Sequence, residues 1–99
     1  MKMTQLLYFK TVAESGKISS AARKLYVTAP AVSIAIANLE KELGVELFDR
    51  SSNRVTLNEQ GKIYFEFVNR MFSDLDQAKK AVQAMATTES TLTDSNSVL

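Results

Sequence analysis

The sequence contains no cysteine, no histidine and no tryptophan, and it has one proline and three glycines in 99 residues. Without cysteine, the chain has no disulfide, no thiolate nucleophile and no zinc–thiolate site. Without histidine, it lacks the side chain most often used as a general base or metal ligand near neutral pH. The glycines are too far apart to form a phosphate-binding loop. These absences predict a protein that is not an enzyme and that binds no metal and no cofactor.

Long apolar runs are also missing from the sequence. The run from Ile34 to Ala37 shows how short they are, whereas a membrane-spanning helix needs about 20 apolar residues. The N-terminal segment is interrupted by Lys10 and has no small-residue cleavage site, which is not typical of a signal peptide. We therefore expect a cytoplasmic protein that does not associate with a membrane.

The charges nearly balance over the whole chain but not along it. Lysine and arginine number 12, and aspartate and glutamate 11, which leaves a formal net charge of +1. Residues 1–39 carry a net charge of +4, whereas residues 40–48 and 87–99 each carry −2. Such asymmetry can mark a nucleic-acid-binding face. Taken alone, however, it is more often the solvated surface of a helix.

Helical spacing predicts two short helices in the N-terminal part of the chain. The first covers residues 4–15 with Thr4 as its N-cap, and apolar side chains recur along it every three or four residues. The second covers residues 20–26, with Ser19 or Ser20 as its N-cap. Small side chains in this second helix would allow a neighbouring helix to approach closely.

A third helix is predicted from Thr28 to Gly44. Thr28 is a suitable N-cap, and Pro30 falls in the first turn, where its missing N–H group costs nothing. One face of this helix repeats apolar residues at intervals of 4, 3 and 4, namely Val32, Ile36, Leu39 and Leu43. The short turn between the second and third helices predicts a helix-turn-helix over about residues 18–37.

The residues after Gly44 predict a small β-hairpin, or wing. Val55-Thr56-Leu57 alternates like a strand, and the polar residues 50–54 would form the tip. The predicted fold class is therefore mostly α. It is a winged helix-turn-helix over residues 1–57, with a three-helix core and the hairpin as wing, followed by a long dimerisation helix.

Residues 58–86 predict this long helix, with Asn58 as its N-cap. Apolar residues recur along it at intervals of 4 and 3, which is typical of helix-to-helix association. This row, the heptad seam, consists of Tyr64, Val68, Met71, Leu75, Ala78, Val82 and Met85. We expect the seam to form a homodimer interface; the alternative is that it packs on its own chain. The apolar residues off the seam are expected to pack on the domain body: Ile63, Phe65, Phe67 and Phe72.

The predicted helix-turn-helix indicates which residues would contact double-stranded DNA. The second helix of such a motif enters the major groove by its N-terminal turns, while cap residues and lysines contact phosphate oxygens. An arginine beside the wing tip can enter the adjacent minor groove. The predicted DNA-binding residues are Lys17, Ser19, Ser20, Thr28, Ala29, Pro30, Ser33, Ile34, Arg50 and Arg54. Two alternatives stay open: Arg54 as a turn residue facing solvent, and Arg50 as the partner of Asp49 or Glu46.

The spaced residues of the helices and the wing also form a family pattern. They include Leu6-x-x-Phe9-x-x-Val12-Ala13, Ser19-x-Ala21-Ala22-x-x-Leu25, Thr28-x-Pro30-Ala31-Val32-Ser33-x-x-Ile36-x-x-Leu39-Glu40, Leu43-Gly44-Val45-x-Leu47-Phe48-x-Arg50 and Leu57-Asn58-Glu59-x-Gly61. With these residues, the chain resembles LysR-type transcriptional regulators over about residues 1–86. The resemblance implies a winged helix-turn-helix, a linker helix that forms an antiparallel dimer, and binding to an interrupted inverted repeat near regulated promoters.

The sequence departs from this family on the predicted recognition helix. The family commonly has glutamine second in that helix and a basic or polar residue after the serine, whereas this chain has Ala29 and Ile34. Ala35 and Ala37 add further apolar positions. We therefore expect base readout to depend on few polar groups and on apolar contact of Ile34 or Pro30 with a thymine methyl group. This predicts weaker or T-rich discrimination.

The chain also departs from the family in its length. The family normally adds a larger C-terminal effector domain, and a small-molecule effector is expected only where that domain exists. Residues 87–99 include seven serines or threonines and predict a flexible polar tail. The chain is thus either a fragment or a naturally truncated protein. In the second case, an alternative function is a protein-interaction module that dimerises with a full-length regulator and binds DNA weakly.

Overall fold

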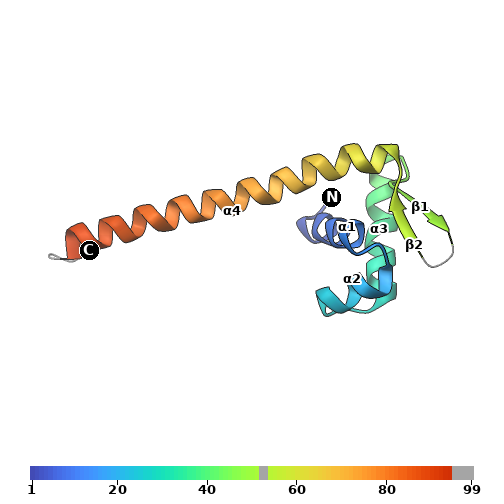
Figure 1. Cartoon of the computed structure of the whole chain (residues 1–99), viewed down its shortest axis with the longest axis horizontal. Helices are drawn as coiled ribbons and strands as arrows, with labels where there is room; N and C mark the ends of the chain where they lie inside the picture. Colours follow the sequence, from blue (N-terminus) through green and yellow to red (C-terminus); the bar gives the residue numbers. More distant parts are fainter. Residues whose placement is uncertain (52–53, 95–99) are drawn as a thin grey trace. The chain divides into compact units, whose positions relative to one another are not determined.

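The computed structural model describes the backbone of residues 1–51 and 54–94, and the side chains of these residues up to position 86. Its elements are α1 (Met3–Ser15), α2 (Ile18–Leu25), α3 (Ala29–Leu43), β1 (Phe48–Ser51), β2 (Arg54–Leu57) and α4 (Glu59–Asp94) (Figure 1). The chain divides into two compact units, residues 1–69 and the residues from Arg70 onward. The first unit confirms the predicted winged helix-turn-helix, because three short helices pack together beside a two-stranded hairpin.

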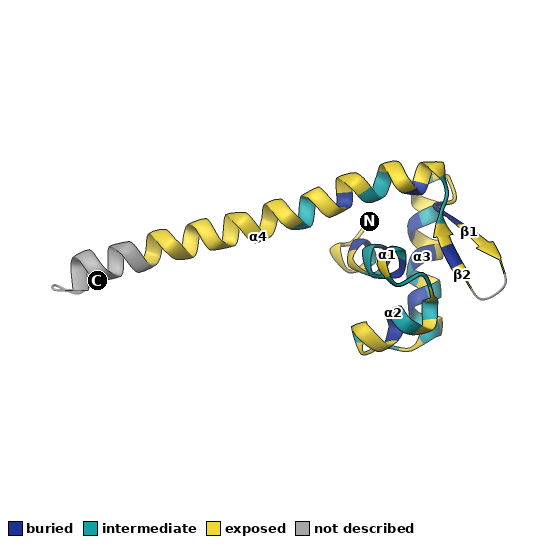
Figure 2. Cartoon of the chain, in the orientation of Figure 1, coloured by how far each residue is buried: buried dark blue, intermediate teal, exposed yellow. Residues whose placement is uncertain are grey.

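The core of the first unit is built from one face of each helix and from the hairpin. The buried hydrophobic residues, dark blue in Figure 2, are Leu6, Phe9, Val12, Ala21, Ala22, Val32, Ile36, Leu39, Leu47, Phe48, Val55 and Val68. Phe9 of α1 is completely buried, and its ring centroid lies 5.4 Å from that of Phe48 and 5.5 Å from that of Tyr64. The small residues Ala21 and Ala22 of α2 are buried as well, so α2 packs closely on its neighbours.

Helices α1 and α2 begin earlier than the sequence predicted. Lys2 is the N-cap of α1, and its N–H group donates to Oε1 of Gln5 at 2.9 Å. Lys17 is the N-cap of α2, so the chain turns between the helices in only two residues. The predicted N-caps Thr4, Ser19 and Ser20 are therefore wrong, because all three lie inside the first turn of a helix.

Helix α3 begins and ends as predicted. The Thr28 hydroxyl oxygen accepts a hydrogen bond from the Ala31 N–H group at 3.2 Å, and Pro30 lies in the first turn. Gly44 follows the last turn with a φ of 75° and donates its N–H group to the carbonyl of Glu40 at 2.8 Å. Glycine adopts this left-handed conformation without steric cost, and it is therefore a frequent residue at this position.

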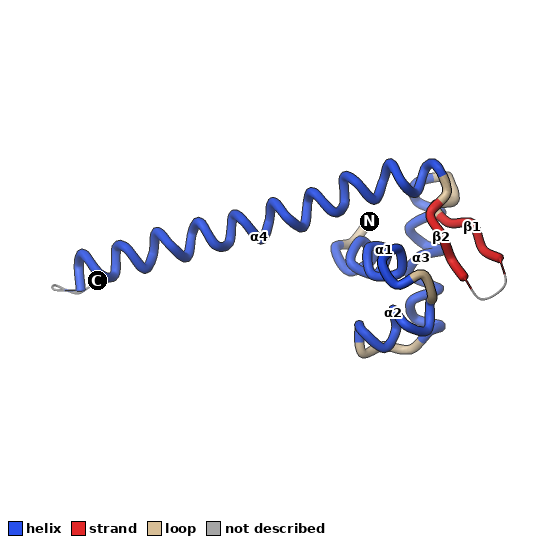
Figure 3. Tube along the Cα trace, viewed as in Figure 1, coloured by secondary structure: helices blue, strands red, loops and turns tan. Residues whose placement is uncertain are grey.

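The hairpin is antiparallel, with Phe48 opposite Leu57 and Ser51 opposite Arg54 (Figure 3). Strand β1 therefore includes Arg50 and Ser51, which the sequence assigned to the tip; residues 52 and 53 lie outside the described residues. The Val55 N–H group donates to the carbonyl of Gly16 at 3.0 Å. This hydrogen bond attaches the hairpin to the turn between α1 and α2.

The junction between the hairpin and α4 is held by backbone N–H groups that donate to both side-chain and backbone oxygens. Asn58 caps α4 as predicted, because its Oδ1 accepts from the Gly61 N–H group at 2.7 Å. The Asn58 N–H group donates to the carbonyl of Leu47 at 3.0 Å, and the Leu47 N–H group donates to Oε2 of Glu40 at 2.7 Å. Gly61 is buried directly against the Leu47 backbone. The start of α4 thus belongs to the domain.

Helix α4 begins as predicted, but its first turns pack on the domain with a face that differs from the expected one. Tyr64 and Val68, assigned to the heptad seam, pack on the domain, since Val68 is buried and Tyr64 contacts Phe9. Ile63 and Phe67, expected to pack there, are 61% and 60% exposed. The prediction is therefore wrong for Ile63 and Phe67, whereas Phe65 contacts Phe9 as expected.

The C-terminal limit of α4 is also later than predicted. The helix continues to Asp94, beyond the expected end at residue 86. No glycine or proline lies between these positions to interrupt the backbone hydrogen bonds. The rest of the predicted tail, residues 95–99, lies outside the described residues. Within the part of the chain that the structure describes, no helix combines the length and apolar character that a membrane crossing requires.

Gly61→Ala should be one of the most destabilising small substitutions in the chain. A Cβ atom at this position would lie 2.9 Å from the carbonyl carbon of Leu47 and closer still to its oxygen. Because backbone must move, we expect a loss of about 3 kcal/mol in the free energy of unfolding, measured by urea denaturation. Gly44→Ala is the control: nothing lies within 4 Å of its Cβ position, and only the left-handed strain remains, about 1 kcal/mol. Equal losses for the two variants would contradict this account.

Tyr64 should make stability fall at alkaline pH. Burial, and secondarily the negative charge of Glu42, raise the pKa of Tyr64 above its ordinary value of 10.0. The folded state therefore favours the neutral phenol, and the stabilisation is complete below pH 10 and is lost as the pH rises through the folded pKa. Urea midpoints between pH 8 and pH 12 should show a shallower decline for Tyr64→Phe than for the wild type. Tyr26→Phe, at an exposed position, is the control; an unchanged decline in Tyr64→Phe would refute the assignment.

Candidate nucleic-acid interface

Helix α3 has one completely buried face and one exposed face. Val32, Ile36 and Leu39 are 0% exposed and anchor the helix in the core. The opposite face is exposed to solvent, and it consists of Pro30, Ile34, Ala37, Asn38, Lys41 and Glu42, whose carboxylate pairs with the N-terminal amino group. The helix thus presents a surface of mixed character, apolar over its first turns and polar toward its C-terminal end.

The predicted contact residues of α3 do not all lie on this exposed face. Pro30 and Ile34 are exposed, and Ile34 is 61% exposed. Thr28 is exposed too, although its hydroxyl oxygen is occupied as the N-cap. Ala29 and Ser33 are half-buried at the edge of the face. The polar groups available near the start of α3 are therefore few.

Two exposed residues of α3 were missed in the sequence analysis. Asn38 lies four residues after Ile34, and Lys41 lies four residues after Ala37, so both share the exposed face. This spacing is visible in the sequence and could have identified them. They add an amide and a positive charge to a face that is otherwise poor in polar groups.

The N-terminus of α2 lies in the same unit and carries predicted phosphate contacts. Lys17 and Ser19 are exposed and Ser20 is half-buried. No side chain caps the first turn of α2, so its N–H groups have no side-chain acceptor. Free N–H groups at a helix N-terminus, together with a lysine, suit a phosphate oxygen.

The arginines of the hairpin differ in their surroundings. Arg50 is exposed in β1, opposite Val55, and it forms no ion pair with Asp49 or Glu46, which removes that alternative. The guanidinium of Arg54 lies against the α1–α2 turn, since a Cβ atom added to Gly16 would be 3.3 Å from Nη1. Arg54 is the first residue of β2, and its guanidinium group lies beside the turn that contains Gly16 and Lys17.

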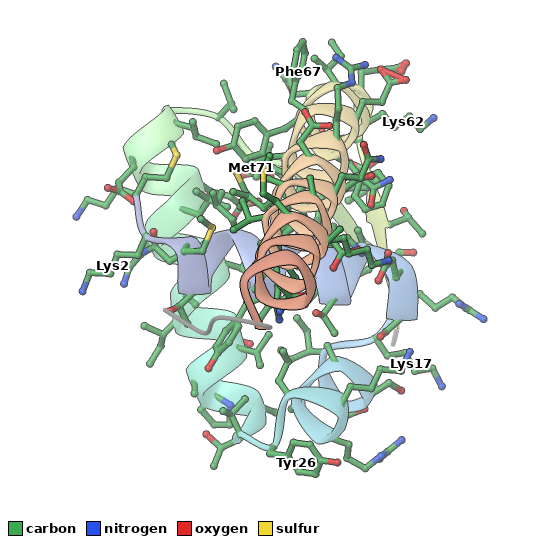
Figure 4. The ribbon with its side chains drawn as sticks, turned by 90° about the vertical axis from the view of Figure 1, so that its left-hand side faces the viewer. Lys2, Lys17, Tyr26, Lys62, Phe67 and Met71 are labelled. Atoms are coloured by element: carbon green, nitrogen blue, oxygen red, sulfur yellow. The ribbon has the colours of Figure 1, made fainter. Side chains whose placement is uncertain are left out.

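Tyr26 is an unexpected feature of the turn between α2 and α3. It has a φ of 59°, the one positive φ of a non-glycine residue in the part of the chain that is described. Its side chain is 94% exposed, and Figure 4 shows the ring pointing away from the helices. Tyr26 is the C-cap of α2, and its N–H group donates to the carbonyls of Ala22 and Arg23. The left-handed backbone of a residue that carries a Cβ atom costs about 1 kcal/mol.

The fold and this exposed surface define a DNA-binding domain of the winged helix-turn-helix class. Residues 3–62 match the family model of the bacterial regulatory helix-turn-helix protein, lysR family. The chain belongs to this family of transcription regulators. The resemblance stated from the sequence is thereby confirmed.

Curated relatives and solved structures agree with this assignment. The chain is 40% identical over 85 residues to the uncharacterized HTH-type transcriptional regulator YybE of Bacillus subtilis (strain 168), covering 86% of this chain and 29% of YybE. It is 33% identical over 92 residues to the HTH-type transcriptional regulator BenM of Acinetobacter baylyi, covering 93% of this chain and 30% of BenM. The chain thus spans less than a third of the length of these relatives.

A solved structure with a similar fold is the BenM_DBD/catB site 1 DNA complex. It matches with a TM-score of 0.82 and 32% identity, over 87% of this chain and 96% of that chain. The CbnR_DBD–DNA complex matches with a TM-score of 0.79 and 32% identity, over 87% of this chain and 99% of that chain. Both neighbours are domains in complex with DNA.

Tyr26→Gly should stabilise the domain. Glycine adopts the left-handed conformation without strain, and the exposed ring makes no packing contribution that would be lost. We expect the free energy of unfolding to rise by about 1 kcal/mol in urea denaturation. Tyr26→Ala is the matched control, because it removes the ring and keeps the strain. If alanine stabilised as much as glycine, the backbone conformation would not be the cause.

Proposed function

We propose that this chain binds double-stranded DNA sequence-specifically as a homodimer, with α3 in the major groove. The observation that carries the proposal is the exposed face of α3, which lies opposite its buried face. The N-terminus of α2, whose first N–H groups have no side-chain acceptor, lies in the same unit. The two DNA complexes among the structural neighbours support it. In this arrangement, Thr28, Ala29, Pro30, Ser33 and Ile34 form or border the base-contacting surface.

The phosphate contacts of the proposal surround α3. Lys17 and the N–H groups of Ser19 and Ser20 would contact phosphates of one DNA strand. Arg54 lies beside the same turn, between α1 and α2. Arg50 remains a candidate for the adjacent minor groove because its side chain is exposed on β1. Glu40, which would repel DNA, is held by the Leu47 N–H group, and Glu42 pairs with the N-terminal amino group.

The proposed dimer uses the part of α4 that the domain does not. Leu75, Val82 and Met85 are 49%, 67% and 63% exposed in the part of the chain that the structure describes. The proposed interface is therefore shorter than the predicted seam and consists of Met71, Leu75, Ala78, Val82 and Met85. Tyr64 and Val68 are withdrawn from it, because they pack on the domain.

The first unit adds an exposed apolar surface of its own. Ile63 and Phe67 line a groove of about 210 Å³ together with apolar residues that follow α3 and precede the hairpin, among them Val45 and Leu47. Exposed apolar side chains gathered in this way favour association. A dimer would present two copies of α3, which suits an inverted repeat in DNA. A small-molecule effector belongs to this proposal only with a further C-terminal domain.

A second candidate function is that of a protein-interaction module. The apolar first turns of α3 favour it, because they offer few hydrogen-bond groups to base edges. In this case α4 would pair with a full-length regulator and DNA binding would be weak.

One titration series separates the two functions. The full chain is used to select duplexes from a random-sequence pool, and binding of an enriched duplex is measured by fluorescence anisotropy at several salt concentrations. We expect a linear fall of log K with log salt, with a slope of roughly −0.9 for each phosphate contacted. Light scattering should give the mass of a dimer.

Two variants of α4 test the role of the dimer. Val82→Glu places a charge in the proposed interface and should produce monomers that bind the duplex on the order of a hundredfold more weakly. Gln77→Glu adds the same charge at an exposed position outside the interface and should change neither property. Dimers that show no salt-dependent DNA binding would exclude the proposed function in favour of the protein-interaction module.

A further inference from the structure

We propose that Ile34 recognises a C5-methyl group of a pyrimidine in the major groove, an inference that rests on the proposed DNA-binding function. Ile34 is 61% exposed on the face of α3 opposite Val32 and Ile36. Its burial in the domain is too small to explain an isoleucine at this position by core packing. The side chain therefore has its apolar surface available for a partner.

The surroundings of Ile34 on α3 fit a DNA partner. Pro30 lies one turn before it, and Ala37 lies one turn after it; both are exposed and neither carries a donor or acceptor in its side chain. Lys41 follows on the same face and supplies a positive charge in the direction of the C-terminal end. The small Ala37 allows the backbone of α3 to approach a base edge closely, so the branched side chain of Ile34 projects furthest from this part of the helix.

The chemistry of the major groove then selects the ligand. Every base edge there presents hydrogen-bond donors or acceptors, and thymine adds a methyl group at C5. Isoleucine can satisfy none of the polar groups, and covering one of them would remove its water without replacement. The methyl group is the one feature of a base edge whose contact with isoleucine is favourable, because both surfaces are apolar. Thymine and 5-methylcytosine both carry it, so the two sources share the same chemistry.

The test removes the methyl group from the DNA and the side chain from the protein. In a duplex enriched by the full chain, each thymine is replaced in turn by deoxyuridine, which differs only by the C5-methyl group. We expect at least one position in each half-site where the replacement weakens wild-type binding about fourfold, the value for one buried methyl group. In Ile34→Ala the same replacement should have no effect, and Ile34→Val should retain part of it. A parallel selection from a pool with 5-methylcytosine in place of cytosine distinguishes the two sources.

Leu7→Ala is the matched control for these variants. Leu7 is also an exposed aliphatic residue, 41% exposed, but it lies on α1, so its removal should leave the methyl dependence unchanged. If deoxyuridine weakened Ile34→Ala and the wild type equally, another residue such as Pro30 would read the methyl group and the proposal would be overturned. It would also be overturned if no replacement had any effect while salt-dependent binding persisted. Absence of any salt-dependent duplex binding would instead overturn the proposed function and this inference together.

Discussion

The packing of Phe9 is the contact on which the rest of the domain depends. Its buried ring comes from α1, and it touches Phe48 at the start of the hairpin and both Tyr64 and Phe65 at the start of α4. One side chain thus joins three parts of the chain that are far apart in sequence. In a domain this small, where the buried surface is limited, such a shared contact fixes the hairpin and the beginning of α4 relative to the helices.

The composition of the exposed surface separates affinity from specificity. In the proposed complex, Lys17, Lys41, Arg50 and Arg54 would neutralise phosphates whatever the base sequence, whereas the first turns of α3 would present Pro30, Ile34 and Ala37 to the bases. Phosphate contacts position a protein on DNA and make binding depend on salt, but they carry no sequence information. Specificity in such a domain has to come from the shape and apolar character of a base edge more than from hydrogen bonds.

The sequence predicted the elements of the fold well and the partners of individual faces less well. Thr28, Pro30, Gly44 and Asn58 act locally, through capping and turn geometry, and each does so at its predicted place. Phe65 packs on the domain as predicted, but its neighbours Ile63 and Phe67 were misassigned. The heptad spacing shows which residues share a face of α4 but not what covers that face. Tyr64 and Val68 satisfy the dimer pattern, yet the domain uses them. The left-handed Tyr26 follows from the turn between α2 and α3, which depends on tertiary packing, whereas Asn38 could have been found from its spacing to Ile34.

The hydrogen bond from Val55 to Gly16 has a consequence for the shape of DNA that the domain can accept. Because the hairpin is attached to the turn before α2, the guanidinium of Arg54 and the N-terminus of α2 cannot change their separation freely. Positive groups held at a fixed separation bind best where the phosphates across a groove have the same separation. The width of a groove varies with base sequence, and so does the cost of changing it. In the proposed complex, the attached hairpin would therefore favour groove widths that fit this separation, even at base pairs that no side chain touches.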